Sequence, residues 1–244
     1  MRRPHGFEPT RRALELGPQG EALIALAGEA LSPDARFDPV KSTRTFRMAA
    51  PEFVTALIGA NLLHQLKTAA PGVTFAIGHF DEDEAFRWLR RGEMDFAVGR
   101  FGAARPGYQV EPLFGDAYCV VARISHPTIR GAIDVDQWQT SGQILAWNPS
   151  ETAGDGPKME EAPHIRVLAM VPHWLTVLSL VADTDGIGTV PRRLAERHAE
   201  RFRLQVLDLP FPPNPINVSV MRRTGAADAG ADWFLDQVRA ALDA

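Results

Sequence analysis

The stretch from residue 45 to residue 99 alternates short apolar runs with two helical patterns, and it constrains the fold more than any other part of the chain. Apolar residues recur at every second position in the short runs or form brief blocks that end at glycine, as in buried strands. The pattern predicts strands at 45–50, 73–78 and 95–98 and helices at 51–68 and 81–91. Because strands separated by helices pair in parallel, this stretch predicts a parallel α/β sheet.

The carboxyl ends of these strands are the first place to expect a function. In open parallel sheets, ligands bind in the crevice outside the carboxyl ends of the strands. Residues 49–53 and 99–101 follow two of the predicted strands and therefore form the predicted rim of a ligand crevice.

The acidic run from Asp81 to Glu84 opens the second predicted helix, and Arg90 and Arg91 close it before Gly92. Acidic first turns and basic last turns complement the helix dipole, and glycine commonly ends helices. Acid and base catalysis by paired carboxylates would require a desolvated site, which a solvated first turn does not provide. We interpret the run as structural.

The remainder of the chain predicts a second alternating lobe, because 244 residues exceed the usual size of one domain. Residues 110–122 predict a short extended piece followed by a strong strand. Residues 148–163 predict a polar loop rich in glycine and proline. Further predictions are helices at 133–138, 172–181, 191–198 and 231–242, strands at 143–147, 165–170 and 186–190, and extended segments at 204–209 and 215–222.

Composition excludes several classes of function. A net charge of −4 gives no electrostatic reason to expect nucleic acid on this surface. The one cysteine, Cys119, lies in an apolar run, which predicts a buried strand thiol and a reducing compartment. No apolar run approaches the roughly 18 residues of a membrane span. We expect a cytoplasmic protein without a membrane partner.

Six segments together resemble the inducer-binding region of LysR-type transcriptional regulators, in the branch of nodulation and aromatic-degradation regulators. They are the leucine-rich run 16–31, STRTFRMAAPEFV, the turn 70–73, LRRGEMDFAVG, the strand 111–123 with His126-Pro127, and DTDGIGTVPRRLAERH. The resemblance implies a type 2 periplasmic-binding-protein-like fold: two α/β lobes around a ligand cleft, joined by crossing strands near 118–124 and 217–223. It implies a linker helix and linker over 1–42, lobe I over 43–123 plus 216–244, and lobe II over 124–215.

The same resemblance implies a function in gene regulation. Such regulators bind a small-molecule inducer, form homodimers or homotetramers, and contact promoter DNA through an N-terminal winged helix-turn-helix that this sequence lacks. The pattern over 18–31 and the broad apolar surface of helix 51–68 both predict a homo-oligomer, since each helix needs a partner. We expect no enzyme activity, no cofactor and no metal.

The predicted ligand site combines two helix starts with residues at the lobe edges. Helix N-termini bind anions, so starts at Pro51 and Pro172 predict an anionic or strongly polar ligand. Arg100 would supply a cation, and His173 a switchable imidazole where relatives resemble a His-Phe pair. The candidate residues are Ala50, Pro51, Glu52, Phe53, Arg100, Phe101, Thr140, Ser141, His173 and Trp174.

Two other functions use similar folds. A lyase or transferase would need no short motif, because catalytic groups can assemble from distant residues. A solute-binding protein of a transporter would need a signal peptide, and none is visible in the sequence. Trp174 also fits plain core packing.

Overall fold

The computed structural model describes residues 37–102, 105–147, 165–225 and 228–243, together with residues 2, 3, 6, 7, 10, 12, 16 and 20. Near the N-terminus, β1 (Arg2–Arg3) and β2 (Gly6–Phe7) pair in antiparallel. The loop predicted over 148–163 lies outside the described residues, as does nearly all of the helix predicted over 18–31.

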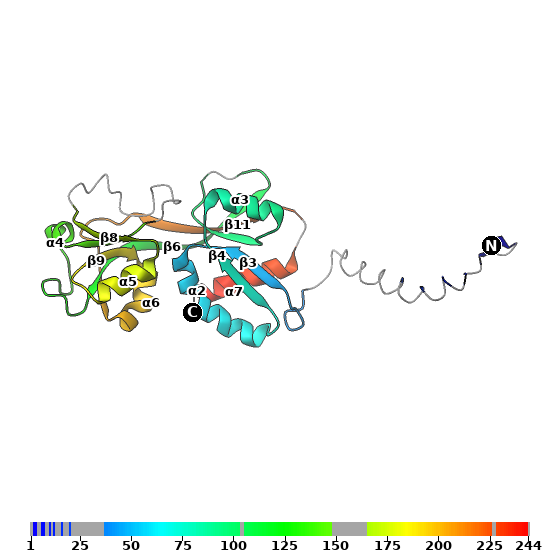
Figure 1. Ribbon diagram of the computed structural model, residues 1–244, viewed down its shortest axis with the longest axis horizontal. Helices are drawn as coiled ribbons and strands as arrows, with labels where there is room; N and C mark the ends of the chain where they lie inside the picture. Colours follow the sequence, from blue (N-terminus) through cyan, green and yellow to red (C-terminus); the bar gives the residue numbers. More distant parts are fainter. Residues whose placement is uncertain are drawn as a thin grey trace.

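Lobe I contains the predicted strand-helix-strand-helix-strand unit. Its elements are β3 (Thr45–Ala49), α2 (Glu52–Ala69), β4 (Thr74–Gly78), α3 (Glu82–Arg91) and β5 (Phe96–Gly99), with α7 (Ala229–Leu242) added from the C-terminus. β3 pairs in parallel with β4 and with β5, which confirms the predicted parallel sheet. Helices α2 and α7 cover one face of this sheet, and α3 covers the other (Figure 1).

Lobe II repeats this plan of parallel strands joined by helices. Its elements are α4 (Val135–Thr140), β7 (Gln143–Ala146), β8 (Val167–Val171), α5 (Trp174–Ala182), β9 (Ile187–Pro191), α6 (Arg192–Phe202) and β10 (Leu204–Leu207). β7 pairs in parallel with β8 and with β9. One face packs on α5 and α6, and the other packs near Trp138 of α4.

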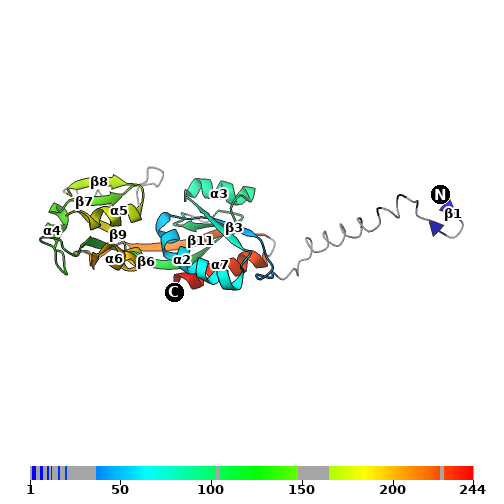
Figure 2. The same ribbon diagram turned by 60° about the horizontal axis from the view of Figure 1, so that its bottom comes forward.

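Two long strands connect the lobes, and one of them, β6, pairs with strands of both. β6 (Tyr108–Arg123) pairs in antiparallel with β11 (Pro215–Arg223) up to Ala117, and from Tyr118 onward it pairs with β9 and β10. Figure 2 shows the two strands side by side between the lobes. β6 changes partner at the start of the predicted crossing near 118–124, and β11 begins at Pro215, beside the crossing predicted near 217–223.

The prediction of two separate pieces over 110–122 was wrong, because β6 is one strand of 16 residues. Pro112 lies inside this strand, although proline cannot donate a ladder hydrogen bond. The register shifts beside it: Val218 pairs with Phe114, and Ser219 with Pro112, so Leu113 is left over as a bulge. The bulge lets the strand continue through the proline.

The ends of α3 confirm the structural interpretation of the acidic run. The side chain of Asp81 accepts a hydrogen bond from the Glu84 N–H at 2.8 Å, and Gly92 ends the helix with φ of 71°. These are an N-cap and a left-handed C-cap.

The broad apolar surface of α2 is satisfied within the chain. Phe53, Val54, Leu57 and Ile58 are buried against the sheet, α7 and lobe II, while Leu63 stays 61% exposed. The expectation that a whole face of this helix is left for a partner was therefore wrong.

Cys119 is the buried strand thiol that the sequence predicted. It is fully buried, and burial raises its pKa to about 12. Among the described helices, none combines the length and the apolar character that crossing a membrane requires.

An aromatic stack joins the first strand of lobe I to the last helix. The rings of Phe46 and Phe234 lie 4.4 Å apart and nearly parallel, and both side chains are 0% exposed. Phe96 adds a third ring, 6.0 Å from Phe234. This stack fixes α7 on the sheet.

We predict that Phe234→Ala lowers the free energy of unfolding by about 3–5 kcal/mol, because it leaves a large cavity in a closely packed core. Urea unfolding followed by circular dichroism measures the change. Phe101→Ala, at a partly exposed ring, should cost much less. Equal losses in the two variants would contradict the central role of the stack.

Candidate functional site

A narrow cleft lies where the two lobes meet. It is lined by Pro51, Phe53, Phe80, Gly99, Arg100, Tyr118, Pro191, Ile216 and Val218. These residues come from lobe I, from both long strands and from the end of β9. The free volume is about 30 Å³, which accommodates about two water molecules. The lobes are therefore nearly closed on each other.

Three of the predicted site residues, Pro51, Phe53 and Arg100, line this cleft. Two others lie just behind its wall. The Ala50 N–H donates to the Gly78 carbonyl at 3.0 Å, and the ring of Phe101 packs edge-on against Phe80 at 5.6 Å. The rim predicted at the ends of β3 and β5 is thus assembled as one surface.

His173 and Trp174 approach the same cleft from lobe II. His173 is exposed and immediately precedes α5, and the ring of Trp174 lies 6.1 Å from the ring of Tyr118, which lines the cleft. Trp174 also packs against the apolar core, so the core-packing interpretation holds for part of its side chain.

The structure does not bring Thr140 and Ser141 to the cleft. They end α4 and precede β7, whereas the cleft lies at the carboxyl ends of the parallel strands β7, β8 and β9. The hydroxyl of Thr140 donates to the Asp136 carbonyl within the same helix, at 2.7 Å. Both residues therefore lie at the opposite edge of lobe II.

Sequence reasoning missed several cleft residues. Phe80, Tyr118, Pro191, Ile216 and Val218 lie within or just after strands and carry no motif of their own. The rule about carboxyl ends, applied to lobe II, would have found Pro191, which ends β9.

The start of α5 faces a carboxylate from the other lobe. His173, its N-cap residue, makes no side-chain capping hydrogen bond. Instead the Leu175 N–H donates to the carboxylate of Glu52, the first residue of α2, at 3.5 Å. The starts of α2 and α5 therefore approach each other as predicted. The acceptor that lies between them is the side chain of Glu52 and not a bound ligand.

The start of α6 is also capped by a carboxylate from a distant part of the chain. Its N-cap residue, Pro191, has no side-chain acceptor, and the Arg193 N–H lies 3.3 Å from both carboxylate oxygens of Asp116 in β6. The Ala117 N–H donates to the same carboxylate at 2.8 Å. Burial raises the pKa of Asp116, against the effect of these N–H groups.

Further contacts join the lobes away from the cleft. The Arg197 guanidinium donates to the Asn61 side chain at 3.0 Å, linking α6 to α2. The guanidinium of Arg193 lies 5.2 Å from the centre of the Phe114 ring. Lobe closure therefore rests on contacts on two sides.

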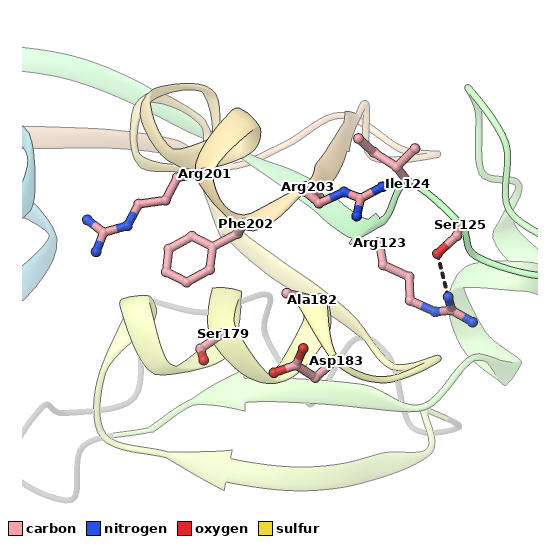
Figure 3. A pocket seen from close by; sticks show the side chains of 9 residues that line it. All are labelled: Arg123, Ile124, Ser125, Ser179, Ala182, Asp183, Arg201, Phe202 and Arg203. Atoms are coloured by element: carbon pink, nitrogen blue, oxygen red, sulfur yellow. Dashed lines mark hydrogen bonds between the residues drawn. The ribbon is translucent and has the colours of Figure 1, made fainter.

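A larger cavity of about 390 Å³ lies on the outside of lobe II, between the last turns of α5 and α6 (Figure 3). Arg123, Ser179, Asp183, Arg201 and Phe202 are among its lining residues. Asp185 and Ser125 already bind the Arg123 guanidinium. This cavity lies at the amino ends of the strands, so the cleft remains the candidate site.

The raised pKa of Asp116 predicts a pH dependence of stability. The Asp116 carboxyl binds a proton more tightly in the folded chain than in the unfolded chain. Protonated Asp116 therefore stabilises the fold. This contribution to the free energy of unfolding is complete below the ordinary aspartate pKa of about 4 and is lost as the pH rises through the pKa of the folded state. Asp116→Asn keeps an acceptor oxygen and should be at least as stable as the parent at pH 7.

The advantage of Asp116→Asn should shrink as the pH falls toward 4, because the folded parent takes up a proton on this carboxyl more readily than the unfolded chain does. Thermal unfolding of both proteins across that range measures it. A variant that loses stability equally at every pH would contradict this account of the α6 cap.

Known transcriptional regulators resemble this chain over most of its length. It is 28% identical to the regulator LeuO of Escherichia coli (strain K12) over 243 residues, covering 98% of this chain and 76% of LeuO. It is 27% identical to nodulation protein D of Bradyrhizobium sp. (strain ANU 289), covering 80% of this chain and 58% of that protein. The chain thus spans between 58% and 76% of the length of these two relatives.

Solved structures confirm the fold. The probable transcriptional regulator PA0477 from Pseudomonas aeruginosa gives a TM-score of 0.74 at 26% identity, over 98% of this chain and 80% of that one. The regulatory domain of MexT from the same organism gives a TM-score of 0.69 at 20% identity, over 81% of this chain and 99% of that one. The predicted type 2 periplasmic-binding-protein-like class is correct.

The family model described as the LysR substrate binding domain matches residues 41–243, which include every element from β3 to α7. The resemblance inferred from six sequence segments is therefore confirmed. The chain belongs to the LysR substrate binding domain family.

Proposed function

We propose that this chain senses a small carboxylate or aromatic inducer in the interlobe cleft and passes that signal to the geometry of a homo-oligomer. Lobe I would comprise residues 43–123 and 216–244, and lobe II residues 124–215. The main supporting observation is the cleft itself, which lies at the carboxyl ends of strands from both lobes, with the starts of α2 and α5 facing each other.

The lining of the cleft supports an inducer with an apolar body and a charged end. Phe53, Phe80 and Tyr118 offer aromatic surfaces, and Arg100 offers a guanidinium beside them. Aromatic walls with a few placed polar groups are typical of small-molecule sites. Ala50, Glu52, Phe101, His173 and Trp174 complete the proposed site. Thr140 and Ser141 are left out, because they lie at the far edge of lobe II.

Regulation is favoured over catalysis or transport, because the relatives are named as transcriptional regulators. In this proposal the chain works in the cytoplasm without a catalytic residue or cofactor. Promoter DNA would be bound by a helix-turn-helix domain outside this sequence.

We predict that a screen of small aromatic and aliphatic carboxylates raises the melting temperature of this chain. Saturation at a hundredfold excess over the dissociation constant adds about 2.7 kcal/mol of stability. His173→Ala should abolish the rise without unfolding the protein, because His173 is exposed at the start of α5 and is proposed to contact the inducer. Differential scanning fluorimetry measures both effects.

The matched control is His64→Ala, which removes an exposed histidine from the outer surface of α2. This variant should respond to the best compound as the parent does. If His173→Ala is stabilised as much as the parent, the inducer binds elsewhere and this site is wrong.

Homo-oligomer formation is supported by apolar side chains on an outer strand. Among the strands in the described part of the chain, β8 is the last on its side of the sheet, and Val167, Leu168 and Met170 are 37%, 49% and 47% exposed. Outer strands with apolar side chains favour pairing with another chain. We propose this strand as part of the contact between copies.

We predict that Met170→Lys shifts the chain toward monomer, because a lysine ammonium is costly to bury in an apolar contact. Sedimentation at tens of micromolar is the measurement. Lys67→Met, on exposed α2 surface, serves as the control for a change in charge alone. A parent chain that is already monomeric at this concentration would refute the proposed contact.

A further inference from the structure

Glu52 links the two lobes through its side chain. It is the first residue of α2 in lobe I, and its carboxylate accepts from the Leu175 N–H at the start of α5 in lobe II. The Trp174 N–H also favours the charged form of this carboxylate. Since α5 has no capping side chain of its own, Glu52 supplies its missing N-cap from another lobe.

This contact borders the cleft. Pro51 and Phe53, on either side of Glu52 in sequence, both line it, as does Tyr118 beside Trp174. The Glu52 carboxylate therefore lies where the charged end of an inducer would meet lobe II. With that contact made, the cleft has a free volume of only about 30 Å³.

The link is weak enough to be displaced. At 3.5 Å it is longer than the usual 2.9–3.0 Å of an N–H to oxygen bond. Burial raises the pKa of Glu52 despite the opposing effects of the Leu175 N–H and the charge of His173. Burial therefore disfavours the ionised carboxylate that caps α5, which weakens the contact between the lobes.

We propose that Glu52 is an interlobe latch, which holds the two lobes together by capping α5 and which a carboxylate inducer displaces. The second half rests on the proposed function. Glu52 thereby becomes a specificity residue: a ligand must offer α5 an acceptor at least as good as the carboxylate that it removes. Ligands without such a group would leave the latch in place.

The test uses the complete chain without an inducer. In Glu52→Ala, the Trp174 and Leu175 amides lose their acceptor, so their hydrogen exchange measured by NMR should speed up by about tenfold or more. The radius of gyration from small-angle X-ray scattering should also increase, because the lobes separate.

Glu82→Ala is the matched control. Glu82 is the first residue of α3, and its carboxylate also accepts a remote backbone N–H, that of Gly102 at 2.9 Å, but within lobe I. It should leave both measurements at the values of the parent. Faster exchange in Glu52→Ala with an unchanged radius of gyration would reduce Glu52 to a local cap and overturn the latch, as would unchanged exchange.

Sodium acetate tests the displacement step by replacing the lost carboxylate. In Glu52→Ala, acetate should slow the exchange of the two amides again, whereas sodium chloride of equal ionic strength should not. Equal effects of the two salts would overturn the proposed competition. The proposed function fails separately, if no carboxylate stabilises the parent chain in the thermal screen.

Discussion

The two lobes depend on one antiparallel pair of strands. β6 belongs to both halves of the sheet, and its partner changes from β11 to β9 and β10 between Ala117 and Tyr118. A slip of one residue in β6 would turn every side chain to the wrong face in both lobes at once. The register is therefore fixed, and relative motion of the lobes has to come from bending near the change of partner.

Capping across the lobes follows from this arrangement. Within lobe I, α3 is capped by its own neighbour Asp81, whereas in lobe II α5 and α6 take carboxylates from Glu52 and Asp116. The N–H groups at the start of a helix need hydrogen-bond acceptors. Lobe II takes two of these acceptors from Glu52 and Asp116, so the caps of α5 and α6 depend on where lobe II lies relative to those carboxylates. Helix stability and lobe orientation are thus coupled in this chain.

The sequence predicted those helices and strands whose signals lie within their own residues. Alternation and caps were enough for the unit from β3 to β5, because each strand and helix there carries its own signals. The crevice rim at Pro51, Phe53 and Arg100 followed from the rule about parallel strands. Family resemblance added the two-lobed plan.

The predictions that were wrong concern features that depend on contacts between residues far apart in the sequence. The continuity of β6 through Pro112 depends on a bulge against Ser219, more than a hundred positions away. The second apolar face of α2 is covered by α7 from the other end of the chain. Thr140 and Ser141 were placed at the cleft without fixing which end of β7 faces it. The role of the Glu52 side chain depends on a contact across the lobes.

The position of Cys119 has a practical consequence. It is the only cysteine among 244 residues, it is fully buried, and it lies one residue beyond Tyr118, where β6 joins lobe II. A thiol reagent can reach it only when this part of the strand opens. The rate of labelling under native conditions would therefore time the opening of the junction between the lobes, with no engineered probe.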